Sequence, residues 1–331
     1  MLVLFIATFG FAAAFSARRT RTVDLRATDS AEIPELANAG AERTAVGGDT
    51  GARGSKVPAA FAGVGDTHAE PDSDRLPPGR RAGNIAIALS WLGFVLLFAG
   101  VATRGVWAER APWGNMYEFS ISSALAVLGV YLVVSIFRDV RWLGLFVIPA
   151  VLLTLGLAVT VLYTEAAQLV PALQSYWLVI HVSAAIICGG AFTVAGALAA
   201  LYLISDRADR PGKGAISRGV VSFGQRLPDA QTLDRLSYKL IAFAFPLWTF
   251  AVVAGAIWAE SAWGRYWGWD PKETWAFITW VIFAGYLHAR TTAGWKGRKA
   301  AILAIVGLAA YVFNYFGVNL LFPGLHSYSG V

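Results

Sequence analysis

The stretch AGNIAIALSWLGFVLLFAGVAT, residues 82–103, runs between Arg81 and Arg104 for 22 residues without a charged side chain. An α-helix rises about 1.5 Å per residue, so roughly 20 apolar residues span the hydrocarbon core of a bilayer. The stretch therefore predicts a transmembrane helix, and it sets the fold class if other parts of the chain repeat the pattern.

The pattern does recur along the chain. Further uncharged apolar segments predict spans over residues 1–17, 119–137, 142–164, 176–205, 240–259, 274–289 and 300–331. Composition agrees, because only 15% of the 331 residues are charged, against about 25% in soluble domains, and the mean hydropathy is +0.56. We therefore expect an all-α polytopic membrane protein with about eight transmembrane helices.

Lysine and arginine are divided unequally between alternate connections. The connections 18–81, 138–141, 207–239 and 290–299 hold 10, 2, 7 and 4 of these residues, which is 23 of the 27. The other side has only Arg104, Arg110, Arg265 and Lys272. Because cytoplasmic loops carry the excess of basic residues, both termini are predicted to lie outside. An anionic inner leaflet accounts for the net charge of +6 without a nucleic-acid partner.

The N-terminal part divides into two segments before the main membrane domain, residues 82–331. Residues 1–17 are at the lower limit for a span, and their basic residues follow the apolar run, the reverse of a secretory signal. Residues 18–81 contain few large apolar groups and are expected to form a disordered cytoplasmic linker. Residues 228–239 are expected to form a short amphipathic helix on the inner surface.

Cys188 is the only cysteine, which excludes an internal disulfide and favours a packing role.

The segment WGRYWGWDPKETW, residues 263–275, concentrates four tryptophans and a tyrosine beside a predicted helix start. Asp270 is expected to cap that helix, with Pro271 at its first position and Glu273 at its third. An interfacial aromatic belt explains one or two aromatic residues at a helix end, as at Trp107. It does not explain the spacing W-G-x-x-W-x-W-D, which favours a rigid aromatic binding surface.

The four histidines are predicted to lie at different depths. His181 lies about five residues into its span, and His326 follows the last span, so both are near the outer surface and the aromatic segment. His288 lies about 17 residues into its span, or ~25 Å deeper, near the inner face. His68 falls in the linker and is expected to be solvated. Ionisable groups at membrane depth are usually functional, although a lone histidine can also simply bind a neighbouring helix.

Two neutral imidazoles beside a flat aromatic surface are typical of haem binding. Imidazole is a good axial ligand of haem iron, and indole faces can stack on a porphyrin. Gly264 and Gly268 would let the backbone approach a large planar ligand closely. Arg265 and Lys272 could pair with the haem propionates.

The motif WGRYWGWD resembles the tryptophan-rich (WWD) signature of the haem-handling membrane proteins of cytochrome c biogenesis. The segments DPKETWAFITW, YLHAR, HSY and PWGNMYE, the last at residues 112–118, resemble the CcsA/ResC branch, which is named CcsB in some bacteria. The similarity covers about residues 81–331, whereas the first 80 residues match nothing specific and the shortened first span departs from the pattern. CcmC and CcmF proteins share the signature, but the chain length and eight spans favour CcsA.

This resemblance implies roles for individual residues. His181 and His326 would be the outward axial ligands of haem b, and His288 the transmembrane histidine that binds haem on its way out. An outward loop within residues 258–275 would present the haem, through Trp263, Gly264, Trp267, Trp269 and Asp270.

The resemblance also implies the function. The family acts in the bacterial plasma membrane with a ResB-type partner and joins haem to the CxxCH cysteines of apocytochrome c. No nucleophile or general base stands out, so the chain would serve as the membrane subunit of a cytochrome c synthase that works by placement. Two alternatives remain: a CcmC-like carrier that loads a haem chaperone, and a b-type electron carrier, which normally needs a histidine pair at each level.

The charge distribution makes the topology testable. Reporters fused after Trp113 or within residues 263–269 should read as external, and those fused at Gly212 or Lys296 as cytoplasmic, because of the 23 to 4 division of basic residues. A cytoplasmic reading at Trp267 would contradict the whole arrangement.

Overall fold

The computed structural model of the protein describes residues 1–18, 79–166, 169, 171–210 and 218–326. Within these ranges all regular structure is helical, with no strand. The predicted linker, including His68, falls almost entirely outside the described residues, as do Gly212 and the last five residues of the chain.

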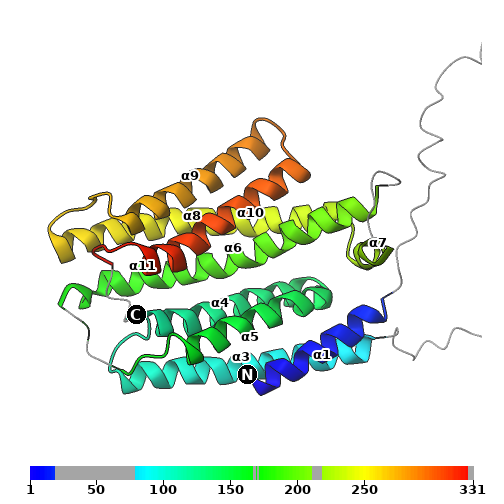
Figure 1. Ribbon diagram of the computed structural model, residues 1–331, viewed down its shortest axis with the longest axis horizontal. Coiled ribbons are helices and arrows are strands. Elements are labelled where there is room, and N and C mark those ends of the chain that lie inside the picture. Colours follow the sequence, from blue (N-terminus) through cyan, green and yellow to red (C-terminus); the bar gives the residue numbers. More distant parts are fainter. Residues whose placement is uncertain (19–78, 167–168, 170, 211–217, 327–331) are drawn as a thin grey trace, which may run out of the picture. The chain divides into compact units, whose positions relative to one another are not determined.

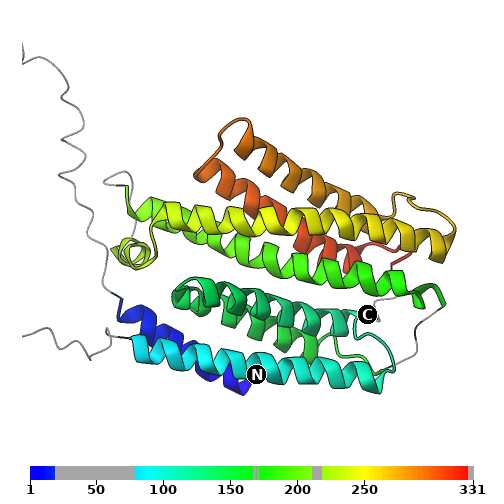
Figure 2. The same ribbon diagram turned by 180° about the vertical axis from the view of Figure 1, so that it is seen from behind.

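Each predicted span contains helical structure (Figures 1 and 2), although in the span predicted over residues 300–331 the described helices end at Leu321. The elements are α1 (Leu2–Ser16), α3 (Arg80–Trp107), α4 (Met116–Phe137), η1 (Arg141–Leu143), α5 (Gly144–Thr160), η2 (Pro171–Leu173), α6 (Tyr176–Ala208), α7 (Arg218–Arg226), α8 (Ala230–Trp263), α9 (Pro271–Thr291), α10 (Arg298–Val312), the π-helical turn η3 (Phe313–Gly317) and α11 (Val318–Leu321).

The predicted all-α membrane class is confirmed, while the number of spans is confirmed only in part. Among the described residues, six helical segments are long and apolar enough to cross a membrane: Arg80–Ala108, Met116–Phe137, Arg141–Thr160, Tyr176–Ala208, Ala230–Trp263 and Arg298–Leu321. Helix α1 is apolar but has only 15 residues. Helix α9 has 21 residues, with charged side chains near both ends, and is not among the six.

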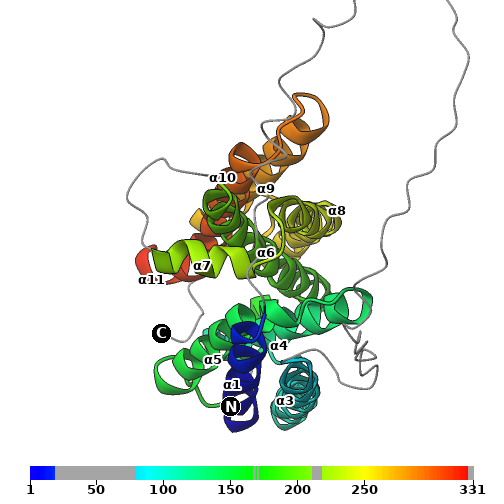
Figure 3. The ribbon, with the colours of Figure 1, turned by 90° about the vertical axis from the view of Figure 1, so that its right-hand side faces the viewer.

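Helix α6 is the centre of the packing. It contacts α4, α5, α7, α8 and α10, and the view along the helices shows it between α4 on one side and α8 and α10 on the other (Figure 3). A Cβ at Gly190 would come within 2.9 to 3.1 Å of the α4 backbone around Ala126. Small residues of this kind let membrane helices approach closely, so α6 can hold the two groups of helices together.

The prediction of a separate surface helix over residues 228–239 is wrong, because the segment forms the beginning of α8. Asp229 caps α8 by accepting a hydrogen bond from the Thr232 N–H at 2.8 Å. Asp234 then pairs with Arg290 of α9 at 2.7 and 2.9 Å. The polar side of the segment is therefore used against a neighbouring helix, and no break separates it from the apolar part of α8.

Two connections far apart in sequence lie at one end of the bundle. These are residues 108–115, between α3 and α4, and residues 264–270, between α8 and α9 (Figures 1 and 2). The α4–α5 and α9–α10 connections lie at the other end (Figures 1 and 2). The fold thus brings the tryptophan-rich segment to the same end as the segment PWGNMYE.

Candidate functional site

A cavity lies at this end, among α4, α6, α8, α9 and the π-helical turn. Its lining is dominated by aromatic rings: Trp113, Phe119, Trp248, Trp258, Trp263, Tyr266, Trp267, Tyr311 and Tyr315. The polar side chains that line it include His181, Lys272, Glu273, Asn314, Asn319 and His326. Residues predicted separately to bind one ligand therefore share one cavity.

His181 is held by the backbone of a neighbouring helix. Its Nδ1 lies 2.7 Å from the carbonyl oxygen of Ala251 in α8. A Cβ at Gly255 would lie only 2.8 Å from the imidazole ring, so glycine at this position gives the ring the space it needs. A carbonyl can only accept, which makes Nδ1 the donor and leaves the lone pair of the neutral ring on Nε2, as in metal-binding histidines.

His326 is held by a carboxylate from the tryptophan-rich loop. Its Nδ1 lies 2.9 Å from Asp270 Oδ2, and the neighbouring Leu325 N–H donates to Asp270 Oδ1 at 2.8 Å. Burial raises the pKa of Asp270, but hydrogen bonds from His326, Leu325 and Lys272 outweigh it and hold that pKa below its ordinary value. The ionised carboxylate fixes the Nδ1 proton, so the Nε2 of a neutral His326 carries the lone pair.

Trp258 packs against both histidines. Its ring centroid is 6.2 Å from the His181 ring, nearly parallel to it, and 5.8 Å from the His326 ring. The side chain is 2% exposed, and Trp263 packs on it at 4.9 Å. The sequence pattern did not single out Trp258, because a tryptophan near a helix end is common in membrane proteins.

The tryptophan-rich loop is fixed by a capping network. The predicted capping box of Asp270 and Glu273 is confirmed. Glu273 accepts hydrogen bonds from the Gly268 N–H at 2.8 Å, the Asp270 N–H at 3.1 Å and Arg265 Nη1 at 3.1 Å. Gly264 ends α8 with a φ of 70°, a conformation that favours glycine. The loop is rigid at both ends.

Not all of the predicted site residues come together. His181, His326, Trp263 and Trp267 line the cavity, whereas Trp269 is 65% exposed and is not part of the lining. Trp269 contacts Trp267 edge-to-face at 5.8 Å. His288 is exposed near the far end of α9, about 25 Å along the helix from its start.

The two basic residues near the loop already have protein partners. Arg265 pairs with Glu273. Lys272 Nζ donates to the carbonyl oxygen of Asn314 and to Asn319 Oδ1, both at 2.9 Å. Asn314 lies in the π-helical turn, and such turns are frequent at functional sites. Lys272 still lines the cavity.

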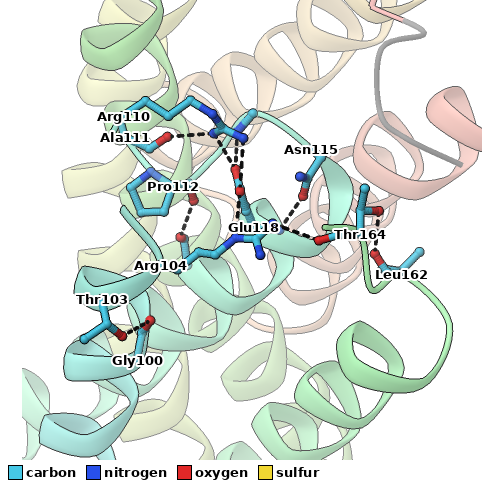
Figure 4. Close-up of polar contacts among 12 residues, drawn as sticks. Gly100, Thr103, Arg104, Arg110, Ala111, Pro112, Asn115, Glu118, Leu162 and Thr164 are labelled. Carbon is cyan, nitrogen blue, oxygen red and sulfur yellow. Dashed lines mark hydrogen bonds and ion pairs between the residues drawn. The ribbon is translucent and has the colours of Figure 1, made fainter. Parts of the chain in front are cut away.

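A second polar cluster holds the other loop at this end (Figure 4). Glu118, at the start of α4, is fully buried and binds Arg104 and Arg110 at 3.0 and 2.7 Å. The turn that it holds, Trp113–Met116, lines the cavity. Trp113 belongs to the segment PWGNMYE, which carries the family resemblance but predicts no role in binding for this residue. The segment W-G-N-x-x-E repeats the order of tryptophan, glycine, capping residue and glutamate found at Trp267–Glu273.

The cavity lining combines imidazoles with aromatic rings. It offers two imidazoles on aromatic walls, and no cluster of three or more His, Cys, Asp or Glu that could hold a bare metal ion occurs in the described ranges. A metal that already has four equatorial donors needs only axial nitrogen ligands from the protein.

Comparison with known proteins gives a consistent assignment. The family model described as "Cytochrome C assembly protein" matches residues 113–326. "Cytochrome c biogenesis protein CcsA" of Trieres chinensis is 38% identical over 258 residues, which covers 71% of this chain and 83% of the relative. The protein of the same name from Gloeobacter violaceus is 35% identical over 304 residues, covering 77% and 88%. The one from Synechococcus elongatus is 38% identical over 265 residues, covering 67% and 81%.

The contact between Asp270 and His326 makes Asp270 more than a helix cap. Asp270→Ala should cost about 1 kcal/mol of stability through the lost cap and should release His326, so that diethyl pyrocarbonate modifies His326 faster, as measured by mass spectrometry. Asp270→Asn keeps a cap but exchanges one acceptor oxygen for a donor, so we expect near-normal stability with an intermediate modification rate.

Asp229→Ala is the matched control, because Asp229 also caps a helix: it caps the start of α8, at the end of α8 away from the tryptophan-rich loop. It should lower the thermal stability to a similar degree and leave the modification of His326 unchanged. Equal modification rates in all of these variants would show that Asp270 does not hold His326.

Proposed function

This chain belongs to the cytochrome c assembly protein family, and we propose that it holds haem b in the cavity between His181 and His326 for attachment to apocytochrome c. The family membership places the chain in cytochrome c biogenesis and confirms the resemblance to CcsA. The observation that carries the finer proposal is that His181 of α6 and His326, after α11, both pack against Trp258. In each of them, Nδ1 is hydrogen-bonded to an oxygen acceptor of the protein.

The remaining cavity groups fit a haem substrate. Trp248 Nε1, Trp113 Nε1 and Asn314 Oδ1 are buried without a hydrogen-bond partner within the described part of the chain, and all three residues line the cavity. Buried polar atoms are rarely left unpaired in the functional state. A ligand with a large apolar plane and a few polar substituents would cover the rings and supply partners for these atoms.

The proposed reaction depends on how the haem is positioned relative to the cysteines more than on chemical activation by this chain. A thioether forms when the S–H of an apocytochrome cysteine adds across a haem vinyl C=C, with sulfur bonding to one carbon and hydrogen to the other. No leaving group departs and no net oxidation occurs. The contribution of this chain is to fix the plane and rotation of the haem through His181, His326 and the aromatic walls, which converts an encounter in solution into a reaction at a fixed distance.

We also propose that the cavity faces outward from a bacterial plasma membrane and that α1 and α9 complete eight spans. The four basic residues at the cavity end support this orientation, because each is bound to protein groups: Arg104 and Arg110 to Glu118, Arg265 to Glu273, and Lys272 to Asn314 and Asn319. In the described part of the chain, the other lysines and arginines lie toward the end of the bundle away from the cavity, which is the end expected to face the cytoplasm.

Two alternatives have different outcomes. A haem carrier would bind haem in the same cavity but would pass it to a chaperone, so covalent haem would never form on apocytochrome c with this chain and its partner alone. A b-type electron carrier would need a second histidine pair, yet His288 has no histidine neighbour at its end of the described bundle. Removing the gene should abolish c-type cytochromes and leave b-type cytochromes intact; the loss of both would favour the electron carrier.

The histidine pair gives the first functional prediction. His181→Ala and His326→Ala should each abolish holocytochrome c and convert the low-spin spectrum of the purified haem-bound protein to a high-spin or empty form, because one axial ligand is lost. Added imidazole should restore part of the low-spin signal by filling the vacated position. Normal maturation in both single variants would contradict the proposal.

The tryptophans should differ according to their place in the cavity. Trp267→Ala removes a lining ring, so the haem content should fall by about fivefold or more for a loss of roughly 1 kcal/mol of aromatic contact. Trp269→Ala should have a smaller effect, because Trp269 reaches the cavity only through its contact with Trp267.

Trp107→Ala is the control for an exposed tryptophan at the same end of the bundle, since Trp107 is 76% exposed. It should leave the haem content and cytochrome c maturation near normal. Equally small effects on haem content in the Trp107, Trp267 and Trp269 variants would indicate that the aromatic segment is only an interfacial belt.

We further propose that His288 shares a haem with a ResB-type membrane partner. His288 is exposed, so its ring is accessible to another chain. Co-purification should recover such a partner, and His288→Ala should remove a haem signal that appears only in the complex. A six-coordinate haem that requires His288 in the isolated chain would rule out the shared site.

A further inference from the structure

A second turn contributes to the wall of the cavity. Its lining residues are Trp113, Gly114 and Asn115, between α3 and α4, and Met116, the first residue of α4. Trp113 packs against the apolar cluster that contains Leu178 and Trp258. Its Nε1 is buried and has no hydrogen-bond partner among the described protein atoms. Trp113 therefore lies at the wall of the cavity where we place the haem and has a buried N–H without a partner among the described protein atoms.

Glu118 holds this turn in place (Figure 4). One carboxylate oxygen accepts from Arg104 Nε at 3.0 Å and Arg110 Nη2 at 3.2 Å, and the other from Arg110 Nη1 at 2.7 Å and the Gly114 N–H at 2.8 Å. Arg104 Nη2 also donates to the Thr164 carbonyl at 2.8 Å, which ties the turn to the segment after α5. Glu118 is fully buried, so losing these partners would leave an unpaired charge inside the protein.

The same arrangement occurs in the tryptophan-rich loop. In W-G-N-M-Y-E, residues 113–118, Asn115 caps α4 by accepting from the Glu118 N–H at 2.9 Å. In W-G-W-D-P-K-E, residues 267–273, Asp270 caps α9. In both, the glutamate at the third helical position accepts from the glycine N–H at 2.8 Å and from an upstream arginine.

In both turns, the tryptophan before the glycine lines the cavity. Two chain segments about 150 residues apart thus use one design to direct a tryptophan at the same space. The turns differ in charge, because Glu118 faces two arginines and Glu273 faces one. A purely structural cap would explain the glutamate and the arginines, but not a buried indole donor left without a partner.

We propose that the turn 113–118 is a second haem-binding turn, in which Trp113 contacts the haem and Glu118 is the positioning residue. This inference rests on the proposed function, because it requires haem in the cavity. It extends the binding surface from the tryptophan-rich loop to the start of α4.

The test uses the full chain purified with its membrane partner. The haem content is measured first, and the haem loss rate is then followed as transfer to excess apomyoglobin. Trp113→Ala should speed haem loss by about fivefold or more, the effect of one stacked aromatic ring. Trp113→Phe keeps an aromatic ring but removes the N–H and part of the indole surface, so its rate should fall between those of Trp113→Ala and the wild type. Trp107→Ala should match the wild type.

Glu118→Gln tests the positioning role. It should speed haem loss in the same direction as Trp113→Ala and should leave the low-spin spectrum of the haem that remains bound, because His181 and His326 are intact. If this variant fails to fold, the two Trp113 variants decide alone.

The outcomes separate this inference from the function on which it rests. Wild-type haem loss in Trp113→Ala, when His181→Ala and His326→Ala lose their low-spin haem, would overturn only the second binding turn. A wild-type complex that holds no haem would overturn both.

Discussion

The site depends on two buried carboxylates, Glu118 and Glu273, each at the start of a helix. A helix start leaves backbone N–H groups without partners, and within a membrane no solvent can satisfy them. Each glutamate satisfies the N–H of a glycine in the preceding turn and pairs with an arginine from the same connection. These hydrogen bonds and ion pairs hold the turns at Trp113 and Trp267 in place at the wall of the cavity.

The orientation of both histidines is also set by hydrogen bonds to buried polar groups of the protein. His181 uses a carbonyl of α8 and His326 uses Asp270, which also caps α9. One side chain thus starts a helix, fixes the end of the described chain and orients a histidine. Both rings have Nδ1 engaged, and both lie beside Trp258. Preorganisation of this kind lowers the free-energy cost of holding a substrate in a reactive orientation.

Much of this arrangement could be predicted from the sequence, because it depends on local patterns. Charge-free apolar runs gave the helices, and D-P-K-E gave the cap of α9. The roles of Trp258 and Glu118 could not be predicted, since they depend on which helices pack together and a lone tryptophan or glutamate carries no such information. The same limit applies to residues 228–239, for which the sequence pattern predicts a surface helix: Asp234, on the polar side of this segment, pairs with Arg290, 56 residues later in the sequence. The pairing of Arg265 and Lys272 with haem propionates stays a prediction; within the protein, both side chains already have acceptors.

The most direct test of the central claim is covalent trapping of haem in the cavity. In a Cys188→Ala background, which removes the only native cysteine, a cysteine at Val252 or Leu178 would lie on the cavity wall, whereas one at Val253 or Val179 would point away from it. Under reducing conditions a wall thiol near a haem vinyl group should form a thioether, so haem should stay on the chain in a denaturing gel for Val252→Cys or Leu178→Cys and not for Val253→Cys or Val179→Cys. Equal labelling at wall and outward positions, or none at either wall position in a chain that holds haem, would contradict the placement of haem between His181 and His326.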